Sequence, residues 1–462
     1  MFIKETYQQR RAKIHATMKS GLALFLGNQE SPINYPGNTY HFRQDSNFIY
    51  FFGLNLPNLA AVMDFDKETD TLFGDDIDIE DIIWMGPQAS LKSQTEKAGI
   101  EHAEPLARLE TVLHEAMAKG RKIHFVPQYR AENKILISEL LGIKARFVQA
   151  YTSTELIKAI VPVRSVKTLE EIAEIEKACA VGYKMHTMAM KMARKGVKES
   201  EIAGFIDGIS FQYGTGTSFP TILSQNGEIL HNHGHKNTLE AGKLLLVDAG
   251  AEIESGYCSD NTRTTPVSGR FTQKQKEIYQ IVLNANNTAR EATVPGRKYQ
   301  EVHLIAAKVI ASGLKELGLM TGDIDDAVRE GAHALFFPHG LGHHIGLDVH
   351  DMENLGENYV GYDAETQRIN QFGTAYLRMG KRLEVGHVVT NEPGIYFIPA
   401  LIDLWQGEKK FTDFINYDKL REYRDFGGIR LEDDILVTET GCRILGERIP
   451  IEVEEVENFM KG

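Results

Sequence analysis

The sequence predicts an α+β protein of two domains, with a smaller α/β domain at residues 1–163 and a larger domain at residues 164–462. Three observations lead to this prediction. The chain of 462 residues is longer than one ordinary hydrophobic core supports. Strand-like and helix-like segments alternate up to about residue 160, and a helix start signal follows "PVRSVK". The content of 42% hydrophobic and 25% charged residues is typical of a globular protein.

The first domain is predicted from segments of contrasting pattern. "GLALFLG" at 21–27 and "NFIYFFGL" at 47–54 are short apolar runs typical of strands. "LARLETVLHEAMAKG" at 106–120 has the periodicity of an amphipathic helix. Few catalytic residue types cluster in this part of the chain, so we expect the chemistry to lie in the second domain.

The second domain is expected to begin with a long helix. Thr168 and Glu171 form a capping-box pair, in which each side chain accepts a hydrogen bond from the other residue's backbone. Apolar residues follow at helical spacing at Ile172, Ile175 and Cys179.

A weak internal repeat runs through the second domain. "GVKESEI" at 196–202 and "GRKYQEV" at 296–302 have Gly, Lys, Glu and an aliphatic residue at matching places. Each follows a helical pattern, opens another helix and is later followed by strand-like segments. The match indicates either two copies of a helix, helix, sheet unit or a chance similarity.

The overall charge and the cysteines exclude several classes of protein. A formal net charge of −13 argues against nucleic acid or an anionic membrane as the main partner, because their phosphates would be repelled. The three cysteines lie far apart and predict neither a disulfide framework nor a zinc knuckle. No signal-peptide pattern and no run near the ~20 apolar residues of a membrane span is present. We therefore expect a cytoplasmic protein.

Two aspartates flank a predicted turn in the segment 243–269. Asp248 and Asp260 lie symmetrically about a turn near Glu254, so strands paired in that register would hold their Cα atoms ~4.5–5.5 Å apart on one face. Carboxylates that close repel unless a cation lies between them. The pair predicts a divalent metal site, and the alternative is two unrelated turn aspartates.

The stretch "FPHGLGHHIGLDVHD" at 337–351 contains four of the sixteen histidines of the chain. Gly340 and Gly342 allow close approach of the backbone on either side of His343. A single histidine is more often structural, but several near a carboxylate pair favour metal binding, because neutral imidazole is a common ligand of transition metals. His343 is the predicted ligand, and His344 is predicted to be structural.

Two further carboxylates are predicted to join the site. In "GHVVTNEPGIYF" at 386–397, Glu392 ends an aliphatic strand just before a Pro-Gly pair. In "GGIRLEDDILVT" at 427–438, alternation places Arg430, Glu432 and Asp434 on one strand face. Of these three, Asp434 is interpreted as an exposed strand end.

Together the candidate ligands comprise four carboxylates and one imidazole: Asp248, Asp260, His343, Glu392 and Glu432. Two divalent ions offset four buried negative charges, whereas one ion would leave carboxylates to protonate. Oxygen-rich ligation with one nitrogen and no sulfur favours Mn²⁺, with Co²⁺ or Zn²⁺ as competitors. Two such ions can share and deprotonate a water that attacks a carbonyl, which predicts hydrolysis of an amide.

The motifs "VDAG", "SDNTRTTPVSG", "HGLGHHIGLDVHD", "NEPGIYF" and "GGIRLEDDILVTETG" together resemble the aminopeptidase P and prolidase branch of the pita-bread metallopeptidases, in the family's order. The resemblance covers nearly the whole chain, and "HFRQDSNFIYFFGL" resembles the family's noncatalytic N-terminal domain. It implies a pita-bread catalytic domain of two related halves and two metals bound by the five residues named above. It also implies a homodimer or a larger assembly.

The resemblance implies further roles, residue by residue. His231 matches a histidine that lines the substrate pocket, and His339 and His350 match the pair that hydrogen-bonds the scissile carbonyl. Glu392 matches the carboxylate that accepts a proton from the attacking water. Arg430 matches an arginine beside the bridging glutamate.

Two long segments bear on whether the chain is more similar to prolidases or to aminopeptidase P. The insertion at 398–426 resembles prolidases, and Arg378 resembles the prolidase arginine that binds the terminal carboxylate of a dipeptide. The stretch at 352–376 is longer than in prolidases, and the hairpin between the two aspartates is one residue longer than the family's usual spacing.

The predicted function is a metal-dependent exopeptidase that cleaves Xaa-Pro bonds in dipeptides or in longer peptides. The alternatives are a noncatalytic pita-bread module that binds proteins, which typically lacks the metal ligands, and a creatinase-like hydrolase, which does not need the full set. All five ligand positions are filled in this sequence, which favours the enzyme.

Overall fold

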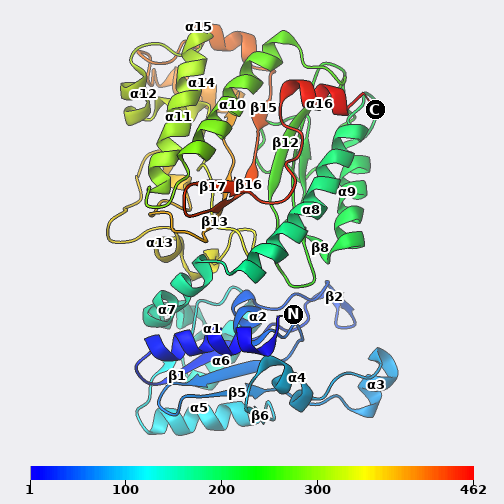
Figure 1. The fold of residues 1–462 in the computed structure, drawn as a ribbon, viewed down its shortest axis with the longest axis vertical. Coiled ribbons are helices and arrows are strands. Elements are labelled where there is room, and N and C mark those ends of the chain that lie inside the picture. The colour runs from blue at the N-terminus through cyan, green and yellow to red at the C-terminus, as the bar shows by residue number, and fades with distance from the viewer. Residues whose placement is uncertain (1, 462) are drawn as a thin grey trace. The chain divides into compact units, whose positions relative to one another are not determined.

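The chain forms two units in the computed structural model, which describes residues 2–461 (Figure 1). One unit comprises Met1–Arg164 with Glu353–Tyr359, and the other comprises Ser165–Met352 with Val360–Gly462. Within the first unit, the Asn354 side chain donates a hydrogen bond to the Pro127 carbonyl at 2.6 Å. No sequence signal indicated that this short segment joins the first unit, because the two residues lie 227 positions apart.

The first unit is built on a five-stranded sheet. In spatial order its strands are β6 (His102–Glu104), β5 (Thr69–Phe73), β4 (Ala60–Asp64), β1 (Leu22–Leu26) and β7 (Ile123–His124). The pairs β1–β4 and β4–β5 are antiparallel, and the pairs β1–β7 and β5–β6 are parallel. The predicted strand at 21–27 is confirmed as β1, whose five residues are all buried.

Helices and a small hairpin complete this unit. They are α1 (Lys4–Thr17), β2 (Pro32–Tyr35), β3 (Asn38–Thr39), α2 (Ser46–Phe52), α3 (Ile79–Met85), α4 (Leu91–Ala98), α5 (Arg108–Ala118), α6 (Ala131–Leu141), the 3₁₀ helices η1 (Ala145–Tyr151) and η3 (Glu353–Leu355), and α7 (Thr154–Ser165), which ends at the boundary. The predicted helix at 106–120 is confirmed as α5.

The predicted strand at 47–54 is wrong, because this run forms α2. Asp45 caps the helix by accepting a hydrogen bond from the Phe48 N–H at 3.1 Å. Gly53 ends it with a φ of 69° in the left-handed region. An apolar run without alternation does not distinguish a strand from a buried helix, so the two caps decide the structure.

The second unit places helices on both sides of its strands (Figure 1). Its helices are α8 (Leu169–Met192), α9 (Glu199–Tyr213), α10 (Gln273–Ala292), α11 (Tyr299–Glu316), α12 (Ile324–Glu330), η2 (Ala332–Leu335), η4 (Thr374–Tyr376), α14 (Pro399–Gly407), α15 (Tyr417–Leu420), η5 (Arg421–Tyr423) and α16 (Val453–Phe459), and the short α13 (Glu357–Val360) spans its boundary with the first unit. In Figure 1 the pairs α8–α9 and α10–α11 flank β12, β15 and β16.

The strands of the second unit form four small sheets. They are β12 (Asn261–Pro266), β10 (Leu244–Ala249) and β9 (Ile222–Ser224); β11 (Ala251–Glu252) and β8 (Gly216–Thr217); β13 (Val388–Asn391), β16 (Asp433–Val437) and β17 (Cys442–Ile444); and β14 (Gly394–Tyr396) and β15 (Gly428–Arg430). Every pairing in these sheets is antiparallel.

The predicted start of α8 is confirmed. The Glu171 N–H donates to Thr168 Oγ1 at 3.4 Å, and the Thr168 N–H donates to a Glu171 carboxylate oxygen at 3.0 Å. Ile172, Ile175 and Cys179 are all buried, so the apolar side of the predicted helix faces the core.

The two halves of this unit repeat the same order of elements, with α8 and α9 before one set of strands and α10 and α11 before the other. The repeated glycines make equivalent contacts. The Gly196 N–H donates to the Leu239 carbonyl at 2.9 Å, and the Gly296 N–H donates to the Leu383 carbonyl at 2.8 Å. The weak sequence repeat thus lies at equivalent positions in the two halves, at the junction of α8 and α9 in one and of α10 and α11 in the other.

The register predicted for the aspartate hairpin is wrong by two residues. Asp248 pairs with Thr262 instead of Asp260. The turn is closed by a hydrogen bond from the Ile253 N–H to the Tyr257 carbonyl at 3.1 Å, so its centre lies one residue later than predicted. Because side chains alternate along a strand, a shift by two leaves both aspartates on one face as diagonal neighbours.

Candidate metal centre

One cavity of the second unit, with a volume of about 500 Å³, is lined by all the residues that the sequence predicted for the site. The predicted ligands in its wall are Asp248, Asp260, His343, Glu392 and Glu432. The other predicted residues in its wall are His231, His339, His350, Arg378 and Arg430. These side chains are far apart in the sequence, so the fold alone brings them together.

The ends of strands carry most of the candidate ligands. Asp248 lies in β10, Asp260 precedes β12, Glu392 follows β13, Glu432 separates β15 from β16, and His343 lies in the irregular segment before β13. The stretch at 427–438 was predicted as one strand, but it divides in two because β15 pairs with β14 while β16 pairs with β13 and β17.

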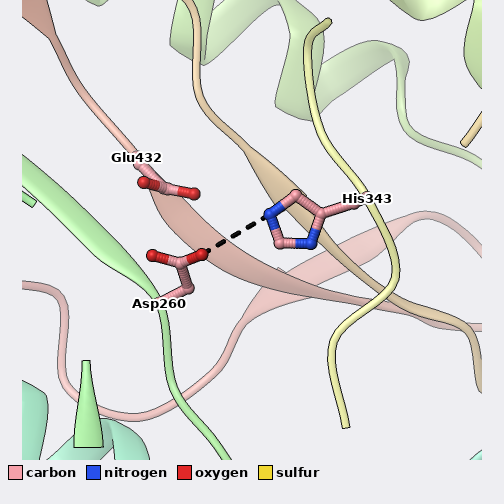
Figure 2. A group of neighbouring side chains, drawn as sticks. All are labelled: Asp260, His343 and Glu432. Atoms are coloured by element: carbon pink, nitrogen blue, oxygen red, sulfur yellow. Dashed lines mark ion pairs between the residues drawn. The ribbon is translucent and has the colours of Figure 1, made fainter. Parts of the chain in front are cut away.

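Asp260, His343 and Glu432 point toward one another from three separate segments (Figure 2). One ligand atom of each residue lies within 4.8 Å of the other two. His343 Nε2 is 3.5 Å from Asp260 Oδ2 and 3.7 Å from Glu392 Oε1. The other ring nitrogen, Nδ1, lies 3.0 Å from the carbonyl of His344, and this hydrogen bond places the proton on Nδ1 and directs the lone pair of Nε2 to the carboxylates.

The positively charged groups of the protein do not offset the burial of three of these carboxylates, Asp260, Glu392 and Glu432. Burial raises the pKa of Glu392 to about 7, because the opposing effect of Arg430 is smaller. Burial, followed by the charges of neighbouring carboxylates, also raises the pKa of Asp260 and Glu432 well above the usual range. Burial lowers the pKa of His343 well below its usual range, so its imidazole is neutral and free to bind a cation.

Arg430 joins three parts of the site. Its guanidinium donates to Asp248 Oδ2 at 2.6 Å, to Tyr396 Oη at 2.8 Å and to Thr262 Oγ1 at 3.1 Å. The Thr262 hydroxyl donates in turn to Glu432 Oε2 at 2.7 Å. The contacts to Asp248 and, through Thr262, to Glu432 orient these carboxylates from their protein side, whereas the contact to Tyr396 orients a hydroxyl.

Tyr396 is a residue of this network that the sequence prediction missed. Its hydroxyl lies 2.9 Å from His339 Nε2 and accepts from Arg430. It lies four residues after Glu392 on an extended segment, and this even spacing is the signal that could have indicated a shared face.

His339 is neutral and engaged on both ring nitrogens. Burial lowers its pKa to about 3, with a smaller contribution from Arg430. Nδ1 donates to the Gly340 carbonyl at 2.8 Å, which leaves Nε2 to accept from the Tyr396 hydroxyl. Contact of His339 with a substrate carbonyl therefore requires that Nδ1 leaves the Gly340 carbonyl.

The interpretation of Asp434 as an exposed strand end is wrong, because its side chain is buried with only 1% exposed. It lies in β16, the central strand between β13 and β17. Asp434 Oδ2 accepts a hydrogen bond from the Asp260 N–H at 3.0 Å and lies 3.4 Å from Cys179 Sγ. Asp434 thus helps to hold the backbone of a candidate ligand.

The remaining predicted residues line other parts of the cavity wall. The ring of His350 lies 4.2 Å from that of His343 in an edge-on arrangement. His231 is exposed in the cavity wall, and Arg378 is partly buried. An apolar part of the wall is formed by Phe219, Pro220, Ile222 and Leu230.

Comparison with known families gives two matches. Residues 173–439 match "Metallopeptidase family M24", and residues 7–124 match "Aminopeptidase P, N-terminal domain". The chain belongs to metallopeptidase family M24. The predicted pita-bread catalytic domain and the smaller domain before it are thereby confirmed.

The M24 relatives cover nearly the whole chain. It is 31% identical to the Xaa-Pro aminopeptidase of Escherichia coli over 99% of its length and 98% of that protein's. It is 30% identical to the human Xaa-Pro dipeptidase over 98% of its length and 91% of that protein's. A structure of a variant E. coli aminopeptidase P in complex with substrate matches with a TM-score of 0.82 and 29% identity, and the match covers 100% of this chain and 98% of that chain.

The residues of this M24 protein fit divalent metal ions. Asp248 Oδ1 and Asp260 Oδ1 are buried and have no hydrogen-bond partner among residues 2–461. Buried carboxylate oxygens without a donor require either a proton or a cation. The His343 lone pair faces the same space. No candidate ligand is missing, so the comparison and the site give no support to the noncatalytic alternative.

The helices of residues 2–461 do not include a membrane span. None of the helices there is both long enough and apolar enough to cross a bilayer.

Proposed function

We propose that this M24 protein is a metal-dependent exopeptidase that hydrolyses Xaa-Pro bonds. The observation that supports it most is the convergence of four carboxylates and the free Nε2 of His343 in one cavity. The Xaa-Pro aminopeptidase and Xaa-Pro dipeptidase relatives support the same chemistry. A zinc-substituted aminopeptidase P in complex with product is among the similar structures, at 30% identity and a TM-score of 0.82.

In this proposal the metals are held by Asp248, Asp260, His343, Glu392 and Glu432. Two bound ions supply positive charge against the carboxylates and the Lewis acidity that activates water and polarises a carbonyl. We propose Mn²⁺ as the native metal, because the donors are mostly hard oxygens with one imidazole and no sulfur. Co²⁺ and Zn²⁺ fit the same donors and are the competitors.

Glu392 is proposed to move the proton during hydrolysis. As a carboxylate it can accept a proton from water and return it to the proline nitrogen as the C–N bond breaks. Its side chain keeps 19% of its surface exposed, so water can reach it from the cavity. His350 and His339 are proposed to hydrogen-bond the scissile carbonyl oxygen, His339 after release of the Gly340 carbonyl.

The preference for proline is proposed to come from the cavity wall. An Xaa-Pro bond lacks the amide N–H that most peptidases bind, so recognition must rest on the ring and on the carbonyl. Phe219, Pro220 and Leu230 offer an apolar surface for the ring. His231 lines the cavity beside them. We expect only the trans isomer of the bond to be cleaved.

Metal removal tests the proposed activity. Protein stripped with a chelator should lose hydrolysis of an Xaa-Pro dipeptide and regain it when Mn²⁺ is added. Asp260→Ala should bind less Mn²⁺ and stay inactive after the same treatment. If reconstituted wild-type protein, with metal bound, hydrolyses neither Xaa-Pro dipeptides nor Xaa-Pro-Xaa tripeptides, the proposed function is wrong.

Arg378 is proposed to select dipeptides by pairing with their terminal carboxylate. Hydrolysis rates for Xaa-Pro and Xaa-Pro-Xaa with the same first residue would measure this preference. Arg378→Ala should lower kcat/KM for the dipeptide by about 10–100-fold and affect the tripeptide less, because a hydrogen bond to a charged group contributes about 1.5–3 kcal/mol. Arg382→Ala, which removes a nearby exposed arginine outside the cavity wall, is the matched control.

We also propose, from composition and family, a homo-oligomer in the cytoplasm that acts on proline-containing di- or oligopeptides. The domain boundary at residue 163 is part of this proposal. Sedimentation of the purified protein tests the oligomer directly.

A further inference from the structure

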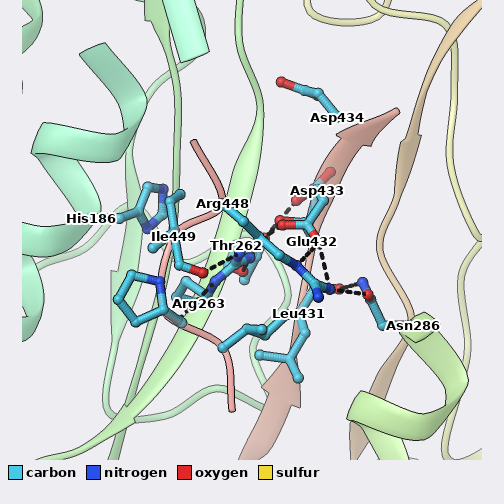
Figure 3. A network of polar contacts seen from close by, with 12 residues as sticks. His186, Thr262, Arg263, Asn286, Leu431, Glu432, Asp433, Asp434, Arg448 and Ile449 are labelled. Carbon is cyan, nitrogen blue, oxygen red and sulfur yellow. Dashed lines mark hydrogen bonds and ion pairs between the residues drawn. The ribbon is translucent and has the colours of Figure 1, made fainter. Parts of the chain in front are cut away.

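A second polar network adjoins the candidate ligand Glu432 (Figure 3). Arg263 and Asp433 form its centre, and both are buried with 1% exposed. Arg263 Nη2 lies 2.6 Å from Asp433 Oδ1. Neither residue lines the cavity, so neither can contact a substrate there.

The network meets the ligand strands at one backbone contact. Thr262 and Glu432 form an isolated antiparallel bridge, in which the Glu432 N–H donates to the Thr262 carbonyl at 3.0 Å. Arg263 Nη1 donates to that same carbonyl at 2.9 Å and to the Glu432 carbonyl at 2.6 Å. The guanidinium therefore ties the strand that follows Asp260 to the segment that carries Glu432.

Strand alternation explains the two faces of this contact. Thr262 and Glu432 are bonded side chain to side chain toward the cavity, and the next residues on each strand, Arg263 and Asp433, are paired on the opposite face. An isolated bridge has none of the further ladder hydrogen bonds that fix register in a long strand pair. Arg263 adds a restraint at this bridge, in addition to the hydrogen bond from the Asp260 N–H to Asp434.

Asn286 of α10 extends the restraint to a third carboxylate, Glu392. Its side-chain amide donates to the Asn391 carbonyl at 3.2 Å and to the Leu431 carbonyl at 3.0 Å. Those residues immediately precede Glu392 and Glu432, so one amide group holds the backbone before both glutamates.

Arg448 links the two parts of the network. It donates to Asp433 Oδ2 at 3.0 Å and to Asn286 Oδ1 at 3.0 Å. The acceptor oxygen of the Asn286 amide is thereby occupied, which fixes the orientation of its NH₂ group toward the two carbonyls. Figure 3 shows Arg448 between Asp433 and Asn286.

We propose that Arg263 and Asn286, joined through Asp433 and Arg448, are positioning residues that set the spacing of the metal-binding carboxylates before metal arrives. The proposal rests on the proposed metal-dependent function. Four carboxylates repel one another in the metal-free protein, and a site must hold its ligands within about 0.5 Å of the productive geometry. Hydrogen bonds to the backbone from buried residues outside the cavity wall hold the carboxylates at this spacing without occupying any ligand oxygen.

The test separates metal affinity from stability. Metal-free Arg263→Met and Asn286→Leu would be titrated with Mn²⁺ by calorimetry, and the thermal midpoint would be measured without metal. We expect affinity for Mn²⁺ to fall by about 10–100-fold in each variant, as for other residues that orient metal ligands. Arg263→Lys, which keeps a cation in place, should recover part of the affinity.

A matched control exists in the first unit. Arg11 is buried with 2% exposed, pairs with Asp70 and donates to the carbonyls of Phe51, Ala98 and Gly99, the same chemistry as at Arg263. Arg11→Met should lower the thermal midpoint and leave Mn²⁺ affinity unchanged.

Two results would overturn the proposal. One is wild-type Mn²⁺ affinity in folded Arg263→Met or, if that variant does not fold, in Asn286→Leu. The other is an equal loss of affinity in Arg11→Met, which would make the effect one of general stability. Wild-type protein that binds Mn²⁺ but cleaves no Xaa-Pro peptide would refute the proposed function and leave this proposal standing.

Discussion

Gly340 offers a sharp test of how tightly the site is packed. An added Cβ at this position would lie 2.5 Å from Leu377 Cα and 3.0 Å from the Tyr376 carbonyl oxygen. The nearest atoms belong to the backbone and not to the end of a flexible side chain, so the clash cannot be relieved by a change of rotamer. Arg378 follows Leu377 directly, and His339 directly precedes Gly340, so a shift of either segment moves a residue of the cavity wall.

The size of the effect follows from this geometry. Carbon atoms pack best at about 3.5–4.0 Å, so Gly340→Ala must displace one of the two segments by roughly 1 Å. Overpacking of this kind costs about 1–3 kcal/mol of stability. A displacement of about 1 Å in a catalytic constellation costs about a hundredfold in rate. We therefore expect both losses together in Gly340→Ala.

Urea unfolding of the metal-free protein would measure the stability, and hydrolysis of an Xaa-Pro dipeptide would measure the rate. Gly208→Ala is the control, because a Cβ at this position in α9 meets nothing within 4 Å. That substitution should stabilise the protein by about 0.5–1 kcal/mol without changing the rate. A Gly340→Ala protein as stable and as active as wild type would refute the packing argument.

Two other predictions concern the carboxylates. Thr262→Val removes the hydroxyl between Arg430 and Glu432 and should lower stability by about 1–3 kcal/mol and Mn²⁺ affinity by about tenfold, because Arg430 Nε is left unpaired. Thr265→Val on the same strand is the control, because it removes a buried hydroxyl with no partner among residues 2–461. Urea unfolding should show this substitution to be neutral or stabilising. Equal effects of the two substitutions on stability would contradict this reasoning. The second prediction concerns pH. The pKa of Glu392 in the metal-free protein is raised from 4.5 to about 7, so the stability that its protonated form contributes is complete below pH 4.5 and lost as the pH rises through 7. The thermal midpoint of the metal-free protein should fall across this window and that of the Mn²⁺-loaded protein should not, and a flat profile without metal would count against the raised pKa.

The side chains that the sequence predicted for the site all line one cavity. They could be predicted from their residue types and their immediate neighbours in the chain. Carboxylates beside Gly, Pro and turn residues, and a cluster of histidines threaded with glycine, are unusual in a structural segment. The cap of α8 was also predicted, since Thr168 and Glu171 form a local pattern at fixed spacing. Signals of this kind depend only on residues close together in the chain.

The incorrect predictions have two causes. The run at 47–54 forms a helix because of its two ends, and the hairpin register depends on where the turn closes. Asp434 is buried because β16 has strands on both sides. Tyr396 joins the site through a hydrogen bond to Arg430, 34 residues away. The helix ends and the turn are local features whose signals were not recognised, whereas the burial of Asp434 and the contact of Tyr396 depend on segments far apart in the chain.

The sequence by itself determined which side chains are available for binding metal and peptide, since charge, nucleophilicity and backbone freedom belong to each residue type. Only the tertiary structure decided that they meet in one cavity, which oxygens face inward and which are held from behind by Arg263 and Asn286. The physical reason is distance. Electrostatic and hydrogen-bond energies depend on separations of a few ångströms, and those separations are set by pairings between strands that lie far apart in the chain.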